Sequence, residues 1–181
     1  MTEYLSKSIR IGIAAICATG VLAFSGAAWA ESVGRKSGLP LPRFVSLKSK
    51  AVNLRVGPGR QYSVSWLYVK SGLPVEVIQE FDQWRRVRDS EGTEGWVYHS
   101  LLTGKRTAII APWSKSEKSV FVEAHSQPNA DAHTVAKLQA GVVVKVNECE
   151  RGWCEVTAGD VDGYVDQQEL WGVYPEEPVK G

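Results

Sequence analysis

The chain has 181 residues, 44% of them hydrophobic and 23% charged, which suits a folded protein of one ordinary domain or two small ones. Its formal net charge is only +1. A nucleic-acid-binding protein would carry a clear excess of Lys and Arg, so we expect no nucleic-acid partner.

The first 30 residues have the pattern of a secretory signal peptide. Lys7 and Arg10 form a basic start, residues 11–24 are apolar, and Ala28-Trp29-Ala30 is a small-x-small cleavage site. We therefore predict a Sec-type signal peptide cleaved after Ala30, a periplasmic or secreted location, and no integral membrane segment after processing. An uncleaved N-terminal anchor is the alternative, but this apolar run is short for a membrane span.

The predicted mature chain is neutral, although its two halves are not. Removing Lys7 and Arg10 leaves 19 of the 21 basic residues, and removing Glu3 leaves 19 of the 20 acidic ones. Residues 31–104 carry 11 basic and 7 acidic side chains (+4), and residues 105–181 carry 8 and 12 (−4). This split is either chance or a sign of attraction between the halves or between neighbouring molecules. The oligomeric state stays open.

Short strands begin after a polar leader. Residues 31–43 contain two glycines and two prolines and no apolar period, so they predict a flexible leader. Residues 45–56 predict one or two strands that end at the hard turn Gly57-Pro58-Gly59. Residues 62–69 predict a further strand or a wide loop.

Two β-hairpins follow. Residues 75–80 alternate, turn at Phe81-Asp82-Gln83 and return over residues 84–88. The second hairpin turns over residues 90–95 and returns through Trp96-Val97-Tyr98. Residues 106–111 predict one more strand, closed by Pro112, which we place in the same unit, residues 44–112.

The same residue types recur further along the chain. The offset is 69 positions from Gly72 to Val87 and 68 after the next turn. The matching pairs are Gly72 and Gly141, Val75 and Val144, Val77 and Val146, Trp84 and Trp153, Val87 and Val156, Gly95 and Gly163, Trp96 and Tyr164, and Val97 and Val165. We therefore predict a second, divergent unit at residues 116–173 and a tail at residues 174–181. Residues 132–139 are left open and include a possible helical turn.

The mature chain contains two cysteines, Cys149 and Cys154. The 69-residue offset projects them onto Glu80 and Arg85, an opposite-charge pair of the kind that faces across neighbouring strands. Because an exported chain meets oxidising conditions, we predict a disulfide between them. The alternative is a metal or redox site of the C-x4-C type, which lacks further ligands nearby.

The first unit contains four motifs in a defined order and spacing: Asn53-Leu-Arg-Val-Gly-Pro-Gly59, Gly72-Leu-Pro-Val-Glu-Val-Ile78, Trp84-Arg-Arg-Val87 and Gly92-Thr-Glu-Gly-Trp-Val97. In these motifs the unit resembles the bacterial SH3-like (SH3b type) domain family. Residues 100–108 resemble the segment that ends such domains in secreted proteobacterial members. The second unit resembles the family weakly. The resemblance implies an all-β protein with two tandem small SH3-like β-barrels, and modules that commonly recognise peptidoglycan or envelope proteins.

The six Trp and Tyr rings of the first unit exceed what a small barrel can bury. We assign structural roles to the recurring aromatic residues and to the residues around the first turn: Asn53, Arg55, Gly57, Pro58, Trp84, Trp96, Trp153 and Tyr164. The ligand-binding candidates are Tyr62, Trp66, Tyr68, Tyr98 and Arg60. Such rings and guanidinium groups stack on sugars or extended peptides and pair with carboxylates.

No catalytic constellation is recognisable, so we predict a non-enzymatic protein with no catalytic residue, cofactor or metal. His99, His125 and His133 come without a motif. Residues 160–163 with Glu169 match much of an EF-hand calcium loop, but the repeat aligns them with an ordinary hairpin turn. We therefore expect a cell-envelope protein that binds peptidoglycan or its peptide stems, or alternatively an adaptor that binds an envelope protein. Whether the second unit binds anything is open.

Overall fold

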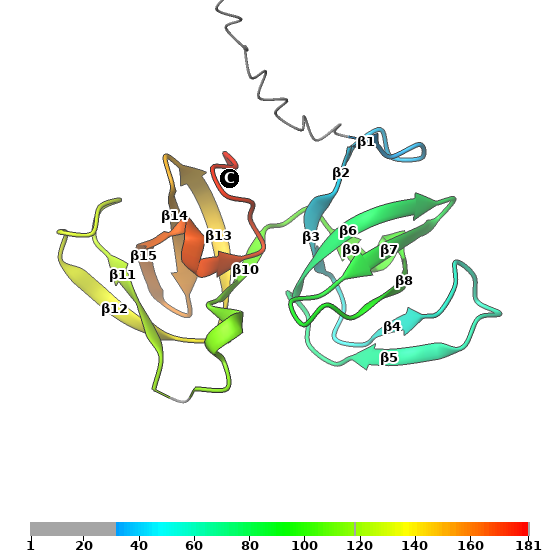
Figure 1. Ribbon diagram of the computed structural model, residues 1–181, viewed down its shortest axis with the longest axis horizontal. Helices are drawn as coiled ribbons and strands as arrows, with labels where there is room; N and C mark the ends of the chain where they lie inside the picture. Colours follow the sequence, from blue (N-terminus) through cyan, green and yellow to red (C-terminus); the bar gives the residue numbers. More distant parts are fainter. Residues whose placement is uncertain (1–31, 118, 181) are drawn as a thin grey trace, which may run out of the picture. The chain divides into compact units, whose positions relative to one another are not determined.

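The computed structural model describes residues 32–117 and 119–180. They form two seven-stranded antiparallel sheets and one two-stranded hairpin (Figure 1). The predicted signal peptide lies outside the described residues. Within those residues, no helix has the length and hydrophobicity needed to cross a membrane.

The first sheet has the strand order β5-β4-β8-β7-β6-β3-β9 and curls around its own core. Its strands are β3 (Arg43–Leu47), β4 (Val52–Arg55), β5 (Val64–Tyr68), β6 (Pro74–Phe81), β7 (Trp84–Arg88), β8 (Glu94–Tyr98) and β9 (Leu102–Thr103). Alternate residues point inward, so the core is almost wholly aliphatic, with Leu54, Val77 and Val97 completely buried. We call this unit the first barrel. It contains both predicted hairpins, β6–β7 and β7–β8.

The second sheet repeats the first strand for strand, in the order β12-β11-β15-β14-β13-β10-β16. Its strands are β10 (Thr107–Ile110), β11 (Phe121–His125), β12 (Thr134–Gln139), β13 (Val143–Glu150), β14 (Trp153–Ala158), β15 (Val161–Asp166) and β16 (Leu170–Trp171). This is the second barrel. The expectation of two tandem all-β units is confirmed, and the undecided residues 132–139 contain strand β12.

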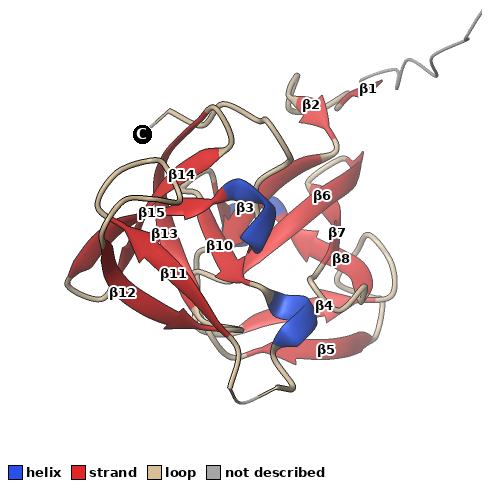
Figure 2. Ribbon diagram, turned by 60° about the vertical axis from the view of Figure 1, so that its left-hand side comes forward, coloured by secondary structure: helices blue, strands red, loops and turns tan. Residues whose placement is uncertain are grey.

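Helical structure among the described residues is limited to three short 3-10 turns (Figure 2). They are η1 (His99–Leu101), η2 (Pro112–Ser114) and η3 (Gln167–Glu169). Two of them occupy equivalent places, since η1 follows β8 in the first barrel and η3 follows β15 in the second.

Strand β10 belongs to the second barrel, whereas we had expected it to close the first. It pairs with β13 and β16. Ala108 and Ile110 are fully buried in the second core, which explains the placement. The boundary between the units therefore falls between β9 and β10 and not at residue 112. Alternation predicts a strand, but it does not reveal which of two sheets the strand joins.

The leader is an ordered hairpin, so the prediction of a flexible leader is wrong for residues 32–43. Strands β1 (Ser32–Val33) and β2 (Pro40–Leu41) pair with each other. The Glu80 carboxylate accepts hydrogen bonds from the backbone N–H groups of Lys36 and Ser37 at 3.2 and 3.0 Å, and from the Ser37 hydroxyl at 2.6 Å. These bonds fasten the leader to the end of hairpin β6–β7.

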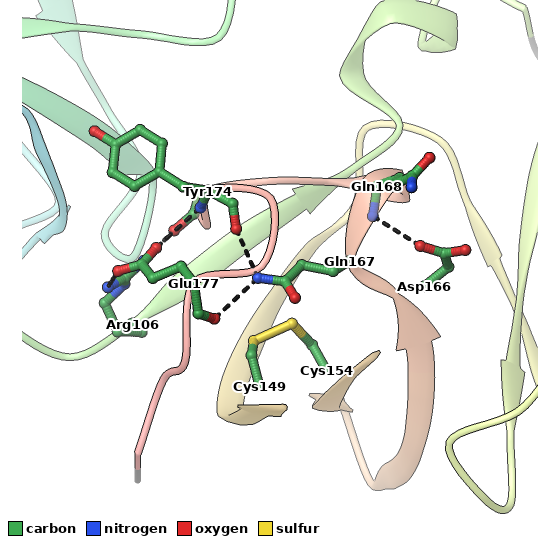
Figure 3. Close-up of a disulfide and its surroundings, with 9 residues drawn as sticks. Arg106, Cys149, Cys154, Asp166, Gln167, Gln168, Tyr174 and Glu177 are labelled. Atoms are coloured by element: carbon green, nitrogen blue, oxygen red, sulfur yellow. Dashed lines mark hydrogen bonds and ion pairs between the residues drawn. A yellow bond between two sulfur atoms is a disulfide. The ribbon is translucent and has the colours of Figure 1, made fainter. Parts of the chain in front are cut away.

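The two barrels cross-link the same hairpin position by different means. Glu80 and Arg85 face each other in β6–β7, with Arg85 Nε 3.2 Å from Glu80 Oε1. Cys149 and Cys154 face each other in the same way in β13–β14 and form a disulfide (Figure 3). The predicted disulfide is confirmed, and an ion pair takes its place in the first barrel.

The tail predicted from residue 174 onward packs on the second barrel, and we call residues 172–180 the C-terminal strap. Val179 and Cys149 exchange backbone hydrogen bonds of 2.9 and 3.1 Å. Glu177 forms an ion pair with Arg106 at 2.8 Å, and the Gln167 amide donates to the carbonyls of Tyr174 and Glu177 (Figure 3). The strap is therefore an ordered segment that is bonded to the second barrel.

Residues of the strap also contact the first barrel. The ring of Phe44 lies 4.7 Å from the ring of Tyr174, measured between centroids. The Tyr174 hydroxyl donates to Glu76 Oε1 at 2.8 Å, while Arg88 holds the other oxygen of that buried carboxylate. One strap thus joins the two barrels through an apolar contact and a hydrogen bond.

Candidate functional site

A cleft of about 430 Å³ opens on the first barrel beside Trp84. Its lining is Ala51, Asn53, Arg55, Arg60, Trp84, Tyr98, Ser100 and Leu101, which includes two arginines and no acidic residue. We call it the basic cleft. Trp84 and Tyr98 stand opposite each other on β7 and β8, and their rings meet edge to face at 5.4 Å.

The loop after β4 builds one wall of the basic cleft. Arg55 Nη1 donates to the carbonyl oxygens of Arg60 and Tyr62 at 3.2 and 2.6 Å, so this side chain closes the loop. Gly57 permits the turn, because a Cβ atom there would lie 2.5 Å from the Tyr62 ring. The closed loop leaves the Arg60 side chain exposed at the mouth of the cleft.

The five ligand-binding candidates do not form one site. Arg60 and Tyr98 line the basic cleft, whereas Trp66 and Tyr68 line a separate groove. Tyr62 is exposed and lies against Gly57. The separation arises because Trp66 and Tyr68 lie on β5, the edge strand, and the cleft is built around β7 and β8.

The groove with Trp66 and Tyr68 has a volume of about 350 Å³ and is also lined by Leu73, Pro74, Ile109 and Pro112. Tyr68 is only 6% exposed, and its hydroxyl donates to Asp89 Oδ2 at 2.9 Å. Burial, together with the charge of Asp89, raises the pKa of Tyr68 well above its ordinary value. Trp66 is 57% exposed and therefore accessible to a ligand.

The recurring aromatic residues Trp84, Trp96, Trp153 and Tyr164 lie outside both cores and are half-buried. Trp84 therefore lines the basic cleft as well as packing on Tyr98. Sequence reasoning did not select Trp84, Asn53, Arg55, Ser100 or Leu101 as lining residues. The recurrence of Trp84 predicts a packing role, but a recurring residue can equally line a cleft.

A family model described as a bacterial SH3 domain matches residues 48–104 and 118–172, together more than half of the chain. The chain belongs to the bacterial SH3 domain family. Each barrel contains one SH3 domain, and the matched stretches leave out the first strand of each barrel, β3 and β10. The basic cleft lies on the first SH3 domain.

Two solved structures are similar to parts of this chain. NlpC2 from Trichomonas vaginalis is 11% identical, with a TM-score of 0.31, over 72% of this chain and 48% of that one. NlpC1 from the same organism is 12% identical, with a TM-score of 0.32, over 76% and 48%. The chain thus spans about half the length of each. No curated protein matches the chain.

Proposed function

We propose that this protein is a non-catalytic binding protein of the bacterial cell envelope, exported to the periplasm or beyond it. Its ligand is peptidoglycan, which the basic cleft of the first SH3 domain binds through the peptide stems. The observation that carries the proposal is the lining of that cleft. It combines guanidinium groups with the paired rings of Trp84 and Tyr98 and includes no carboxylate.

The chemistry of the basic cleft suits an extended peptide with carboxylates attached. Guanidinium groups bind carboxylates through two parallel hydrogen bonds, and aromatic faces pack on flat peptide groups and sugar rings. Nη1 of Arg55 already donates to carbonyl oxygens of the loop, so Arg60 is the arginine that is available to a ligand.

Co-sedimentation with purified sacculi tests this proposal. We expect Arg60→Ala to weaken binding at least about tenfold, because losing a charge-assisted hydrogen bond costs about 1.5–3 kcal/mol. Arg86→Ala is the matched control, since Arg86 has the same charge but pairs with Glu94 and does not line the cleft. Equal losses in both variants, or no sedimentation of the unmodified protein, would overturn the proposal.

The edge strand β5 favours a second candidate function, that of a protein adaptor. Val64, Trp66 and Leu67 are exposed on it, and the exposed Val69 follows it. The equivalent positions of β12 are Thr134, Ala136, Lys137 and Gln139, and a lysine on an edge discourages strand addition. Strand β5 has no lysine at the equivalent position, so its exposed edge can pair with an extended segment of a partner by strand addition.

Photo-cross-linking in cells separates the adaptor from the cell-wall binder. A photoreactive residue in place of Leu67 should capture one defined protein, and the same residue in place of Lys137 should not. If both positions capture the same mixture, or if Leu67 captures only cell wall, β5 is not a protein-binding edge.

A further inference from the structure

The second SH3 domain has a cleft of about 440 Å³ at the place where the first has its basic cleft. The strand register fixes the correspondence. His125 pairs with Tyr164 as Arg55 pairs with Trp96. Asp166 lies opposite Trp153 as Tyr98 lies opposite Trp84.

The charge of this second cleft is inverted. Its lining includes Glu123, Asp166 and Glu169 and contains neither Lys nor Arg. We call it the acidic cleft. Glu123 is paired with Lys137 at 3.1 Å and accepts from Thr134, and Asp166 Oδ1 accepts the Gln168 N–H at 2.9 Å. The two equivalent clefts therefore carry charges of opposite sign, as the two halves of the chain do.

His125 provides an independent indication of what the acidic cleft binds. It is only 8% exposed, and its Nδ1 lies 2.9 Å from the carbonyl oxygen of Ala132. A carbonyl only accepts, so Nδ1 carries a proton and donates it to Ala132, which leaves Nε2 as the ring nitrogen for another partner. Among the described residues, Nε2 has no hydrogen-bond partner, and the ring lines the cleft. The buried histidine thus leaves Nε2 for a ligand in the cleft.

We propose that the acidic cleft is a second binding site, which takes a cationic amino or guanidino group carried on an extended chain. Its carboxylates accept hydrogen bonds from such a group. Trp153, edge-on to His125 at 5.7 Å, adds an aromatic surface for the cation, and the exposed Phe121 packs on the aliphatic stem. The two SH3 domains thereby select opposite charges. This inference does not depend on peptidoglycan being the ligand of the basic cleft.

NMR titration of the purified isotope-labelled protein tests the site, with end-capped tetralysine as the probe and end-capped tetraglutamate as its opposite. Tetralysine should shift the Trp153 indole N–H and the Gln168 amide in a saturable way, and tetraglutamate should leave both unmoved. An absent or non-saturating shift with tetralysine would overturn the proposal.

Two isosteric double variants distinguish binding in the acidic cleft from non-specific electrostatic attraction to the protein surface. Asp166→Asn/Glu169→Gln should weaken tetralysine binding at least tenfold. Asp160→Asn/Asp162→Asn removes the same charge from the β14–β15 hairpin, outside the cleft, and should change tetralysine binding less than twofold. If the double variant in the cleft fails to fold, Glu169→Gln alone replaces it, with an expected loss of at least threefold. Equal weakening in cleft and turn variants would overturn the site. This test uses no sacculi, so its result is independent of whether the basic cleft binds peptidoglycan.

Discussion

Glu80 shows how much one side chain organises in the first SH3 domain. Its side chain is only 2% exposed and lies 2.8 Å from Arg43 and 3.2 Å from Arg85. Burial raises the pKa of the Glu80 carboxyl, but hydrogen bonds from Ser37 and Arg43 and the charge of Arg85 outweigh it and lower that pKa to about 2. The charged form therefore holds the leader and the hairpin together.

We predict that Glu80→Gln lowers the free energy of unfolding by about 3 kcal/mol, because it leaves two arginines near the surface of the core without their counter-charge. Urea denaturation measures the change. Glu91→Gln removes the partner of Lys115 from an exposed ion pair and should cost less than about 1 kcal/mol. Similar losses in the two variants would show that the buried position of Glu80 has no special weight.

The same carboxylate predicts acid sensitivity. Its pKa in the folded chain is about 2, below the ordinary value of about 4.3, so the unfolded chain takes up the proton first. The stabilisation is complete above about pH 4.3 and is lost as the pH falls towards 2. Urea midpoints measured between these values should decline, and the decline should be shallower in Glu80→Gln. Parallel curves for both proteins would contradict this.

Among the elements, β8 and β15 explain why one glycine recurs. A Cβ atom on Gly95 would lie 2.5 Å from Leu54 Cγ, and one on Gly163 would lie 2.8 Å from Val135 Cγ2. In both barrels the glycine lets a neighbouring strand pass closely over the sheet.

We predict that Gly95→Ala destabilises the protein by about 1–3 kcal/mol through overpacking. Gly104→Ala is the control, because a Cβ atom there meets nothing within 4 Å. Thermal and urea unfolding of both variants test the prediction, and it is wrong if Gly95→Ala unfolds like Gly104→Ala.

The hairpin β13–β14 depends on its disulfide. Reduction should lower the free energy of unfolding by about 2 kcal/mol, because the cross-link closes a short loop in the unfolded chain. Reduced unmodified protein and Cys149→Ala/Cys154→Ala should behave alike in urea. A loss confined to the alanine variant would instead indicate the packing of the buried sulfur atoms.

The internal repeat predicted the strand pairing of the hairpins correctly. The segments that have no counterpart in the other unit were predicted poorly. The offset of 69 correctly placed Cys149 and Cys154 where the first barrel has Glu80 and Arg85, because strand register is inherited with the hairpin. Strand β10 lies in the other barrel from the one predicted, the leader predicted to be flexible is ordered, and composition did not predict the packing of the strap. Their order comes from long-range partners, such as Glu80 and Cys149, that local composition does not reveal.

For the whole molecule, Tyr174 is one of the residues that join one SH3 domain to the other. Burial and the nearby charge of Glu76 raise the pKa of Tyr174 above its ordinary value, so the hydroxyl stays protonated and donates. We predict that Tyr174→Phe costs about 1 kcal/mol in urea unfolding, since the ring contact with Phe44 remains. Tyr62→Phe, on an exposed ring, should change stability by less than about 0.5 kcal/mol. An equal effect of both substitutions would remove the assigned role.

At the same scale, the sequence indicated an uneven charge but not its meaning. Counting residues yields +4 and −4, whereas only the fold gathers Arg55 with Arg60 in one cleft and Asp166 with Glu169 in the other. The predicted ligand-binding residues fall into two separate places for the same reason. Nothing in the sequence separates Trp66 from Tyr98, but Trp66 lines the groove on β5 and Tyr98 lines the basic cleft.

The fastening of both end segments has a mechanical consequence. The leader is held by Glu80 and the strap by Cys149, so each described end of the chain is fixed at the tip of a hairpin. A fluorophore, bead or lipid attached directly to Ser32 or Lys180 would therefore be held rigidly against a barrel and not through a flexible linker. Rigid attachment restricts the orientations in which a barrel can reach an immobilised ligand.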